Sequence, residues 1–207
     1  MMLTLVVTGG IGSGKSEVCR LLAEKGLTAQ YNADAKVKEL YDTVPGLLDS
    51  IEIKLGCSLR DDSGKFMPVL LAQRIFTDRG ALEDVEAIVF PALMDDFRAF
   101  AGRSAEQIVI FESATILEKP QFDGFADKVI LVDAPVQTRL ERACRRDGAD
   151  KEKIMARMAN QKLMNALSDG AVDARVDAVI INDGTLDMLS DRIEKVMSDL
   201  FGDWRRI

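Results

Sequence analysis

The chain contains 207 residues, of which 47% are hydrophobic and 29% charged, the composition of an ordinary globular domain. Its formal net charge of −7 argues against a nucleic-acid partner, because proteins that bind nucleic acids usually carry a basic surface. The sequence has no histidine, so mechanisms that need a histidine base or a histidine-bound metal are excluded.

The cysteines and the hydropathy pattern favour a cytoplasmic protein. Cys19, Cys57 and Cys144 are too scattered for a disulfide framework or a zinc site, so we expect reduced thiols. No stretch approaches the roughly 18–20 apolar residues of a membrane span, and we expect no membrane association. The first residues lack the positive charge that opens a signal peptide, and we interpret them as a strand.

Short apolar segments recur along the chain. The first strand ends at Val7, and four later segments share its character: 27–31, 107–111, 128–132 and 178–181. Helical patterns cover 17–25, 136–146 and 188–201, and Trp204, in the tail, is expected to be a surface or docking aromatic. Buried strands that alternate with helices are typical of a parallel sheet covered on both faces. The sequence therefore predicts a three-layer α/β/α fold with a five-stranded parallel sheet.

A glycine-rich loop follows the first strand. Residues 9–16 fit the pattern G-x-x-x-x-G-K-[ST] completely, between a strand and a helix, which is the context of a P-loop. Such a loop points backbone N–H groups inward and forms an anion site at a helix N-terminus. Its lysine reaches the β- and γ-phosphates, and its last hydroxyl binds Mg²⁺. The nucleotide-binding residues expected from the motif are Gly10, Ile11, Gly12, Ser13, Gly14, Lys15 and Ser16, with Ser16 also a metal ligand.

A P-loop alone does not specify a reaction. The short chain, its inserted segments and the lack of an N-K-x-D motif for guanine favour a small-molecule kinase. Residues 35–106 are mostly helical in pattern and have no flexible linker, so we interpret them as a helical substrate-binding insertion. The polar segment 147–170 is interpreted as a lid, and 1–207 as a single P-loop kinase domain.

The order of several motifs resembles the dephospho-coenzyme A kinases. Thr8 and the P-loop look like the opening of that family, and Asn32-Ala33-Asp34 stands where the family has Asp-Ala-Asp. Other similar segments are Phe90-Pro91, 116–118, 132–135, Arg142, 145–148, Gln161, 177–182 and Gly184. The chain departs from the family at Asn32, at Phe90 in place of a histidine, and at Val69 in place of an arginine.

The resemblance implies that the chain phosphorylates the ribose 3′-hydroxyl of dephospho-coenzyme A with ATP, giving coenzyme A and ADP. ATP and Mg²⁺ are the implied cofactors, and the two small molecules are the implied partners of a monomer or a weak homo-oligomer. Two alternatives stay open: another P-loop kinase acting on a nucleoside or nucleotide, and a non-catalytic nucleotide-binding module that regulates a partner.

Asp34 is the expected catalytic base. It lies just past the second strand, at the carboxyl edge of the sheet, where open α/β folds bind ligands. A carboxylate there accepts the hydroxyl proton or orients the hydroxyl, and the resemblance assigns the base to this second aspartate. The alternative is that Asp34 caps the helix that begins near Ala35.

Three arginines are expected on one helix face, because Arg139, Arg142 and Arg146 recur at i, i+3 and i+7. Guanidinium groups match phosphate oxygens and stabilise the charge that spreads during transfer. We expect Arg142 and Arg146 to act with Lys15 in catalysis, and Arg146 also to bind the nucleotide. For Arg139 a solvated basic stripe is an equal alternative.

Two apolar strands end in acids, Glu112 and Asp133. Glu112, on the third strand, is the candidate for a Walker B-type carboxylate that assists Mg²⁺ through water. Asp133 is interpreted as the cap of the following helix. Asn182 follows the last strand, where the resemblance implies a nucleotide contact at the edge of the adenine ring.

Overall fold

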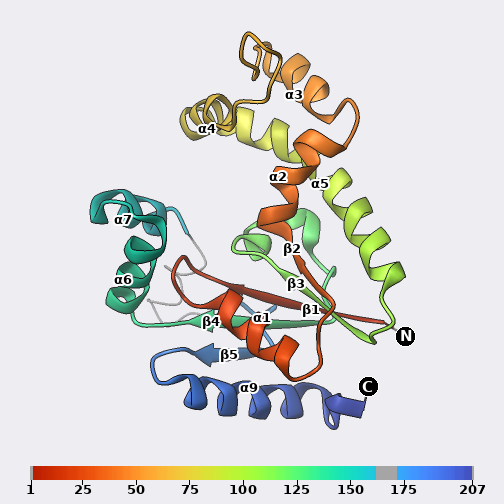
Figure 1. Cartoon of the computed structure of the whole chain (residues 1–207), viewed down its shortest axis with the longest axis vertical. Helices are drawn as coiled ribbons and strands as arrows, with labels where there is room; N and C mark the ends of the chain where they lie inside the picture. Colours follow the sequence, from red (N-terminus) through yellow and green to blue (C-terminus); the bar gives the residue numbers. More distant parts are fainter. Residues whose placement is uncertain (1, 162–171, 207) are drawn as a thin grey trace. The chain divides into compact units, whose positions relative to one another are not determined.

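The computed structural model describes residues 2–161 and 172–206. The chain divides into two compact units, Met1–Asn32 with Ser104–Ile207, and Ala33–Arg103 (Figure 1). The lid expected over 147–170 falls partly outside the described residues, which end at 161 and resume at 172.

The first unit is built on a five-stranded parallel sheet with the order β2-β3-β1-β4-β5. Its strands are β1 Leu3–Gly9, β2 Gln30–Asn32, β3 Ile108–Glu112, β4 Lys128–Asp133 and β5 Ala178–Ile181. The central strand β1 pairs with β3 and β4, so that Val7 lies opposite Glu112 and Gly9 opposite Val132. The predicted three-layer α/β fold with a parallel sheet is confirmed, and all five strands end at the same edge.

Helices α1 (Lys15–Glu24) and α9 (Leu186–Phe201) pack against one face of this sheet (Figure 1). Alternate residues of β1 point to this face: Leu5 and Val7 join the core formed with α1 and α9. A fully buried aliphatic side chain of this kind contributes about 1.5–3 kcal/mol to stability. Trp204 also belongs to this core and is only 2% exposed, so its expected surface position is wrong.

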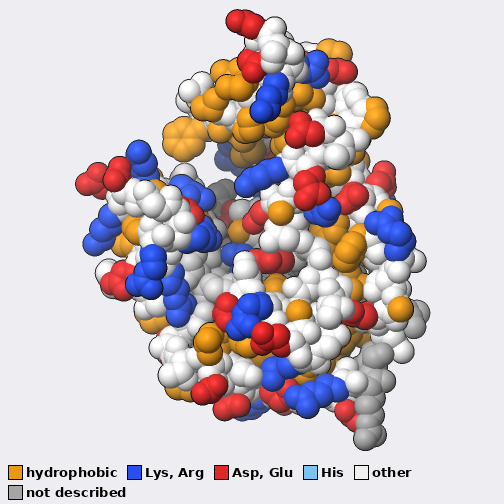
Figure 2. Space-filling view, viewed as in Figure 1, with side chains coloured by type: hydrophobic (Ala, Val, Ile, Leu, Met, Phe, Trp, Pro, Cys, Tyr) orange, Lys and Arg blue, Asp and Glu red, His pale blue; other side chains and the backbone are white. Residues whose placement is uncertain are grey.

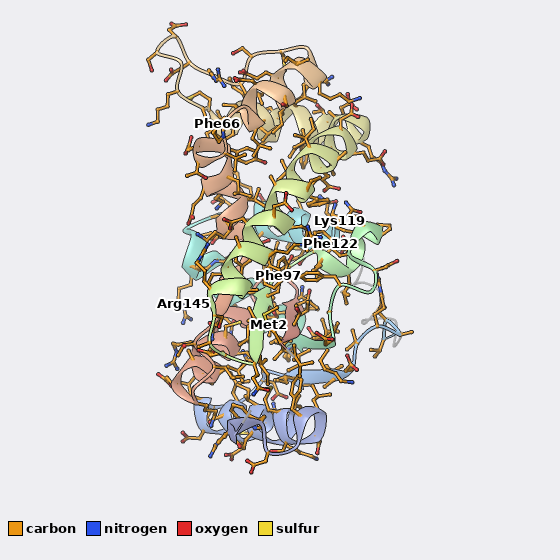
Figure 3. The ribbon with its side chains drawn as sticks, turned by 90° about the vertical axis from the view of Figure 1, so that its right-hand side faces the viewer. Met2, Phe66, Phe97, Lys119, Phe122 and Arg145 are labelled. Atoms are coloured by element: carbon orange, nitrogen blue, oxygen red, sulfur yellow. The ribbon has the colours of Figure 1, made fainter. Side chains whose placement is uncertain are left out.

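An aromatic cluster covers part of the opposite face. Phe111 of β3 stacks on Tyr31 at a centroid distance of 5.5 Å and meets Phe125 edge-on at 5.0 Å. Phe122 joins the cluster from the 3-10 helix η2 (Pro120–Phe122), next to Lys119 (Figure 3). These contacts fix the segment that follows β3.

Strand β2 is shorter than the predicted 27–31 and begins at Gln30. The reason lies in the Glu106 carboxylate, which accepts hydrogen bonds from the backbone N–H groups of Thr28, at 3.2 Å, and Ala29, at 2.9 Å. These N–H groups are therefore satisfied by a side chain instead of a neighbouring strand.

The second unit is helical: α2 Ala33–Thr43, α3 Leu47–Leu55, α4 Pro68–Thr77 and α5 Arg79–Arg103. The long helix α5 packs against the other three and buries a stripe at helical spacing: Ala81, Val85, Val89, Leu93, Phe97 and Ala101.

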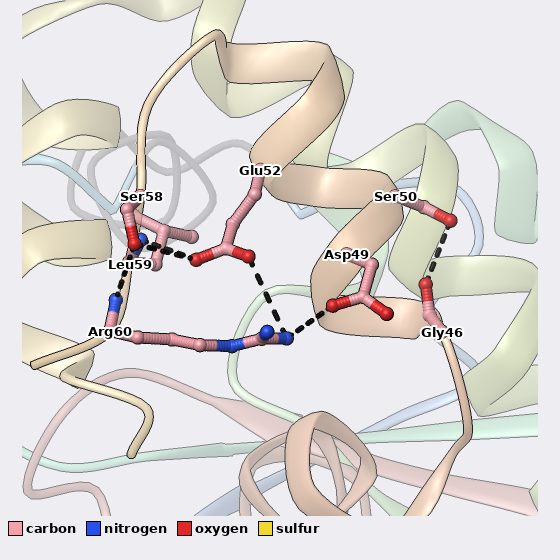
Figure 4. Close-up of polar contacts among 7 residues, drawn as sticks. All are labelled: Gly46, Asp49, Ser50, Glu52, Ser58, Leu59 and Arg60. Carbon is pink, nitrogen blue, oxygen red and sulfur yellow. Dashed lines mark hydrogen bonds and ion pairs between the residues drawn. The ribbon is translucent and has the colours of Figure 1, made fainter. Parts of the chain in front are cut away.

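The turn after α3 is held by a carboxylate (Figure 4). Glu52 accepts hydrogen bonds from the backbone N–H of Leu59 at 2.7 Å and from the Ser58 hydroxyl at 3.2 Å. The guanidinium of Arg60 lies between Glu52 and Asp49 and pairs with both. The charge of Arg60 is therefore neutralised inside this unit.

No helix in the described ranges combines the length and the apolar character that a membrane crossing requires. Cys19, Cys57 and Cys144 are all free.

Candidate active site

The carboxyl edge of the sheet gathers the polar residues that the sequence singled out. The P-loop follows β1, and Asn32, Glu112 and Asp133 are the last residues of β2, β3 and β4. Asn182 comes directly after β5. Because all five strands are parallel, the residues that follow or end them lie at the same edge of the sheet, where α/β folds bind ligands.

The P-loop conformation depends on glycines that lie against β4, α6 (Val136–Asp147) and the residue that follows β5. Gly9, Gly12 and Gly14 have φ angles of 149°, 75° and 98°. A Cβ at Gly9 would lie 2.1 Å from the Val132 carbonyl oxygen. A Cβ at Gly12 would lie 2.0 Å from the Arg139 carbonyl oxygen, and one at Gly14 would lie 2.1 Å from Nδ2 of Asn182. At Gly9 and Gly12 the backbone of the neighbouring segments thus leaves no room for a side chain, and at Gly14 an added Cβ would displace the Asn182 side chain.

We predict that Gly12→Ala weakens ATP binding at least about tenfold, because the loop must move away from α6 to make room. Gly124→Ala is the matched control, since Gly124 has the same φ of 75° but nothing within 4 Å of the added Cβ. Both variants carry the left-handed penalty of about 1–2 kcal/mol. ATP titration by calorimetry measures the difference, and equal affinities for the two variants would contradict the close packing.

Lys15 lies over its own loop. Its Nζ donates to the carbonyl oxygens of Gly9 at 2.9 Å and Gly10 at 3.3 Å. Beside it, the Ser13 hydroxyl is fully buried and has no hydrogen-bond partner among the described residues. The loop therefore carries a cation at its centre, and in P-loops such a lysine and the loop N–H groups form an anion site.

Ser16 and Glu112 meet at the start of α1. The Ser16 hydroxyl donates to Oε1 of Glu112 at 2.7 Å, and Nδ2 of Asn32 donates to Oε2 of the same carboxylate at 2.9 Å. Glu112 is 8% exposed. A hydroxyl and a carboxylate side by side fit Mg²⁺, which takes one or two protein oxygens together with substrate phosphates. In the described parts of the chain no three acidic or cysteine side chains cluster as a metal cage, and a Mg²⁺ ion bound with a nucleotide needs none.

Two side chains hold the P-loop residue Ile11. The backbone N–H of Ile11 donates to Oε1 of Gln161 at 2.8 Å, and its carbonyl accepts from Nε of Arg139 at 3.2 Å. Arg139 is 3% exposed and lies 3.7 Å from Asp133, so it is a buried support of the loop and not part of a solvated stripe. Burial lowers the pKa of the Arg139 guanidinium, while Asp133 opposes this.

Asp133 does not cap α6 as we expected. The N-cap residue is Pro135, and no side chain caps this helix end. The carboxylate of Asp133 instead faces Arg139, where it offsets the cost of burying a cation. The sequence did not indicate the supporting roles of Asp133, Arg139 and Gln161. The resemblance had marked Gln161 only as part of a lid.

Arg142 and Asn182 form a second support. Nδ2 of Asn182 donates to the Ser13 carbonyl at 2.9 Å. Nη1 of Arg142 donates to the Asn182 carbonyl at 3.1 Å and lies 3.9 Å from the position of a Cβ at Gly14. Arg142 is therefore next to the anion loop, and the side chain of Asn182 faces the loop backbone.

Arg146 lies at the exposed end of α6. It pairs with Asp147 at 2.7 Å, and Arg157 of α7 (Lys151–Ala159) pairs with the same carboxylate at 2.9 Å. The two guanidinium groups, Arg146 first, hold the pKa of Asp147 at about 2. Figure 2 shows Lys and Arg side chains gathered over α6 and α7.

Cys19 lies buried in α1, one turn after Lys15. Burial raises the pKa of its thiol strongly, and the Glu112 carboxylate raises it further. A nucleophilic thiolate at neutral pH is excluded at this position.

Asp34 belongs to the second unit. It is the second residue of α2, which begins at Ala33, and its side chain is exposed. Asp34 is therefore not the N-cap of a helix beginning near Ala35, as the alternative interpretation required. A carboxylate in the first turn still interacts favourably with the helix dipole.

Comparison with known proteins agrees with this arrangement. The sequence model of the dephospho-CoA kinase family matches residues 3–187. A dephospho-CoA kinase of Porphyromonas gingivalis is 35% identical over 175 residues, which cover 84% of this chain and 85% of that protein. A solved Thermus thermophilus structure matches with a TM-score of 0.81 at 26% identity, over 97% of this chain and 99% of that one. A dephospho-CoA kinase from Campylobacter jejuni shares the fold, with a TM-score of 0.56 at 20% identity over 96% and 97% of the two chains.

The family match begins in β1 and runs through the P-loop, Asp34, Glu112 and the arginines of α6 to the start of α9. By this match and by its relatives, the chain is a kinase that belongs to the dephospho-CoA kinase family.

Proposed function

We propose that this chain transfers the γ-phosphoryl group of ATP to the ribose 3′-hydroxyl of dephospho-coenzyme A, giving coenzyme A and ADP. The observation that supports the proposal is the gathering of Lys15, Ser16 and Arg142 at a glycine loop with close contacts to its neighbours. The family match over 3–187 supports the choice of acceptor.

Phosphoryl transfer requires alignment and neutralised charge more than covalent help from the protein. Lys15 and the loop N–H groups bind the β- and γ-phosphates. Arg142, beside Gly14, and Arg146, at the end of α6, add positive charge that stabilises the transferred group. To bind the nucleotide, the Arg146 guanidinium leaves the Asp147 carboxylate and pairs with a phosphate group, which carries more negative charge.

Asp34 is the proposed base. The ribose 3′-oxygen forms a bond to the γ-phosphorus while the bond to the β–γ bridging oxygen breaks, and ADP leaves. The proton of the hydroxyl passes to the Asp34 carboxylate. The exposed position of Asp34 in the first turn of α2 leaves it accessible to an acceptor.

Ser16 and Glu112 are the proposed residues for Mg²⁺, Ser16 directly and Glu112 through water. When bound, Mg²⁺ neutralises charge on the β- and γ-phosphates. Asn182 is the proposed contact at the edge of the nucleotide, because it follows β5 and its carbonyl and amide already meet Arg142 and Ser13.

The helical unit Ala33–Arg103 is the proposed acceptor-binding insertion. Its helix α4 exposes apolar side chains on one face: Val69 is 50% exposed and Phe76 is 80% exposed. Exposed apolar side chains at this spacing suit a ligand that has an apolar portion. A cytoplasmic location is supported by the three free cysteines.

An acceptor panel with ATP and Mg²⁺ tests the proposal. We expect ADP release with dephospho-coenzyme A and at least about a hundredfold less with adenosine, AMP or CMP, because the acceptor site must hold the reacting hydroxyl in line. Coupled spectrophotometric detection of ADP gives the rates. Turnover of a nucleoside monophosphate without turnover of dephospho-coenzyme A would assign another kinase activity. Tight ATP binding without turnover on any acceptor would favour a regulatory module.

A further inference from the structure

Strands β2 and β3 place an amide and a carboxylate directly opposite each other at the nucleotide edge. Asn32 and Glu112 are register partners in the parallel ladder, and each is the last residue of its strand. Opposite residues of paired strands project to the same side, so the two side chains meet. Nδ2 of Asn32 donates to Oε2 of Glu112 at 2.9 Å.

Each of the two carboxylate oxygens of Glu112 accepts a hydrogen bond from a different donor. Oε2 is occupied by Asn32, and Oε1 accepts the Ser16 hydroxyl at 2.7 Å. The carboxylate is nearly buried, at 8% exposure, so its plane is set by these two partners. Oε1, the oxygen that lies beside the Ser16 hydroxyl, is the one that faces the proposed cation site.

The amide at position 32 also fixes the charge of its pair with Glu112. An amide donates a hydrogen bond to Glu112 without adding charge, whereas a carboxylate at the same place would put two negative groups within contact distance. A site with one carboxylate and one hydroxyl binds Mg²⁺ weakly unless the nucleotide phosphates complete the coordination.

We propose that Asn32 is a positioning residue for the metal: it orients Glu112 toward Ser16 and keeps the pair of residues 32 and 112 at a single negative charge, so that the divalent cation is bound together with the nucleotide and not before it. The inference rests on the proposed function in taking Mg²⁺ as the companion of ATP. Its Mn²⁺-binding test needs no acceptor, so that test can fail independently of the proposed reaction.

Nucleotide-free binding of Mn²⁺, followed by the electron paramagnetic resonance signal of the free ion, is the direct measurement. We expect weak binding to the wild-type protein and at least about tenfold tighter binding to Asn32→Asp, because a second carboxylate attracts the cation. The double variant Asn32→Asp/Glu112→Gln carries a single carboxylate again and should return to the wild-type affinity. Gln121→Glu adds a negative charge on the exposed segment η2 and controls for net charge alone.

Asn32→Ala tests the orienting role. We expect unchanged nucleotide-free Mn²⁺ binding, but a Mg²⁺ concentration for half-maximal ATP turnover about tenfold higher, with kcat restored at saturating Mg²⁺. A purely structural role, such as ending β2 before α2, would lower Tm and leave the Mg²⁺ requirement unchanged. That outcome would overturn the proposal, as would Mn²⁺ affinities of wild type and Asn32→Asp that agree within about twofold.

Discussion

Asp34→Asn is expected to lower kcat about 10²- to 10⁴-fold while the dissociation constant of ATP stays within about twofold of wild type. The substitution keeps the shape of the side chain and removes only its ability to accept the hydroxyl proton. The proposed ATP-binding residues belong to the P-loop in the other compact unit, so we expect the affinity for ATP not to depend on this carboxylate. Steady-state rates and calorimetric titration with ATP give the two numbers.

Asp42→Asn is the matched control, because Asp42 is an exposed acid near the other end of the same helix α2. It removes the same charge and should leave kcat within about twofold of wild type, as for most exposed substitutions away from a site. If Asp34→Asn and Asp42→Asn have equal rates, Asp34 is not the base. Its role is then limited to the favourable interaction of a carboxylate with the dipole of helix α2.

Lys15→Ala is expected to lower kcat about 10²- to 10³-fold and also to weaken ATP binding clearly. The ammonium lies over the loop, 2.9 Å from the Gly9 carbonyl. In the proposed reaction it contacts the terminal phosphates in the bound state and more strongly in the transition state. Loss of a group that binds the substrate and binds the transition state still more strongly raises KM and lowers kcat together. This combined loss distinguishes Lys15 from Asp34, which should affect kcat alone.

Lys25→Ala serves as the control for Lys15→Ala. Lys25 stands at the other end of α1 and forms a surface ion pair with Glu194 at 3.5 Å, a type of contact that contributes about 0–1 kcal/mol. Initial rates at varied ATP concentration separate kcat from KM for both variants. A Lys15→Ala protein with wild-type KM for ATP would show that the loop binds phosphate without its lysine.

The sheet and the phosphate loop could be predicted because their signals are local. The apolar run that ends at Val7 and the glycines up to Gly14 determine a strand, a turn and a helix start within one short segment. Glu112 was a candidate for the metal from its position after an apolar strand, and the structure places it on the Ser16 hydroxyl. The parallel order then brings distant segments to one edge.

Contacts between distant segments could not be predicted in this way. Arg139 appeared as one member of an arginine stripe, but its neighbours Ile11 and Asp133 come from two other elements. Trp204 has no periodic pattern around it, and only the packing of α9 on the sheet explains its burial. Strand β2 starts late because of the carboxylate of Glu106, which is 78 and 77 residues away from the two N–H groups that it binds.

The most direct test of the proposed transfer is the fate of the γ-phosphate. The protein is incubated with ATP labelled with ³²P in the γ position, Mg²⁺ and dephospho-coenzyme A, and the products are separated. We expect the label in coenzyme A, as a monoester at the ribose 3′ position that a 3′-nucleotidase releases. Label that appears only as inorganic phosphate, or in a product resistant to that enzyme, would contradict the account.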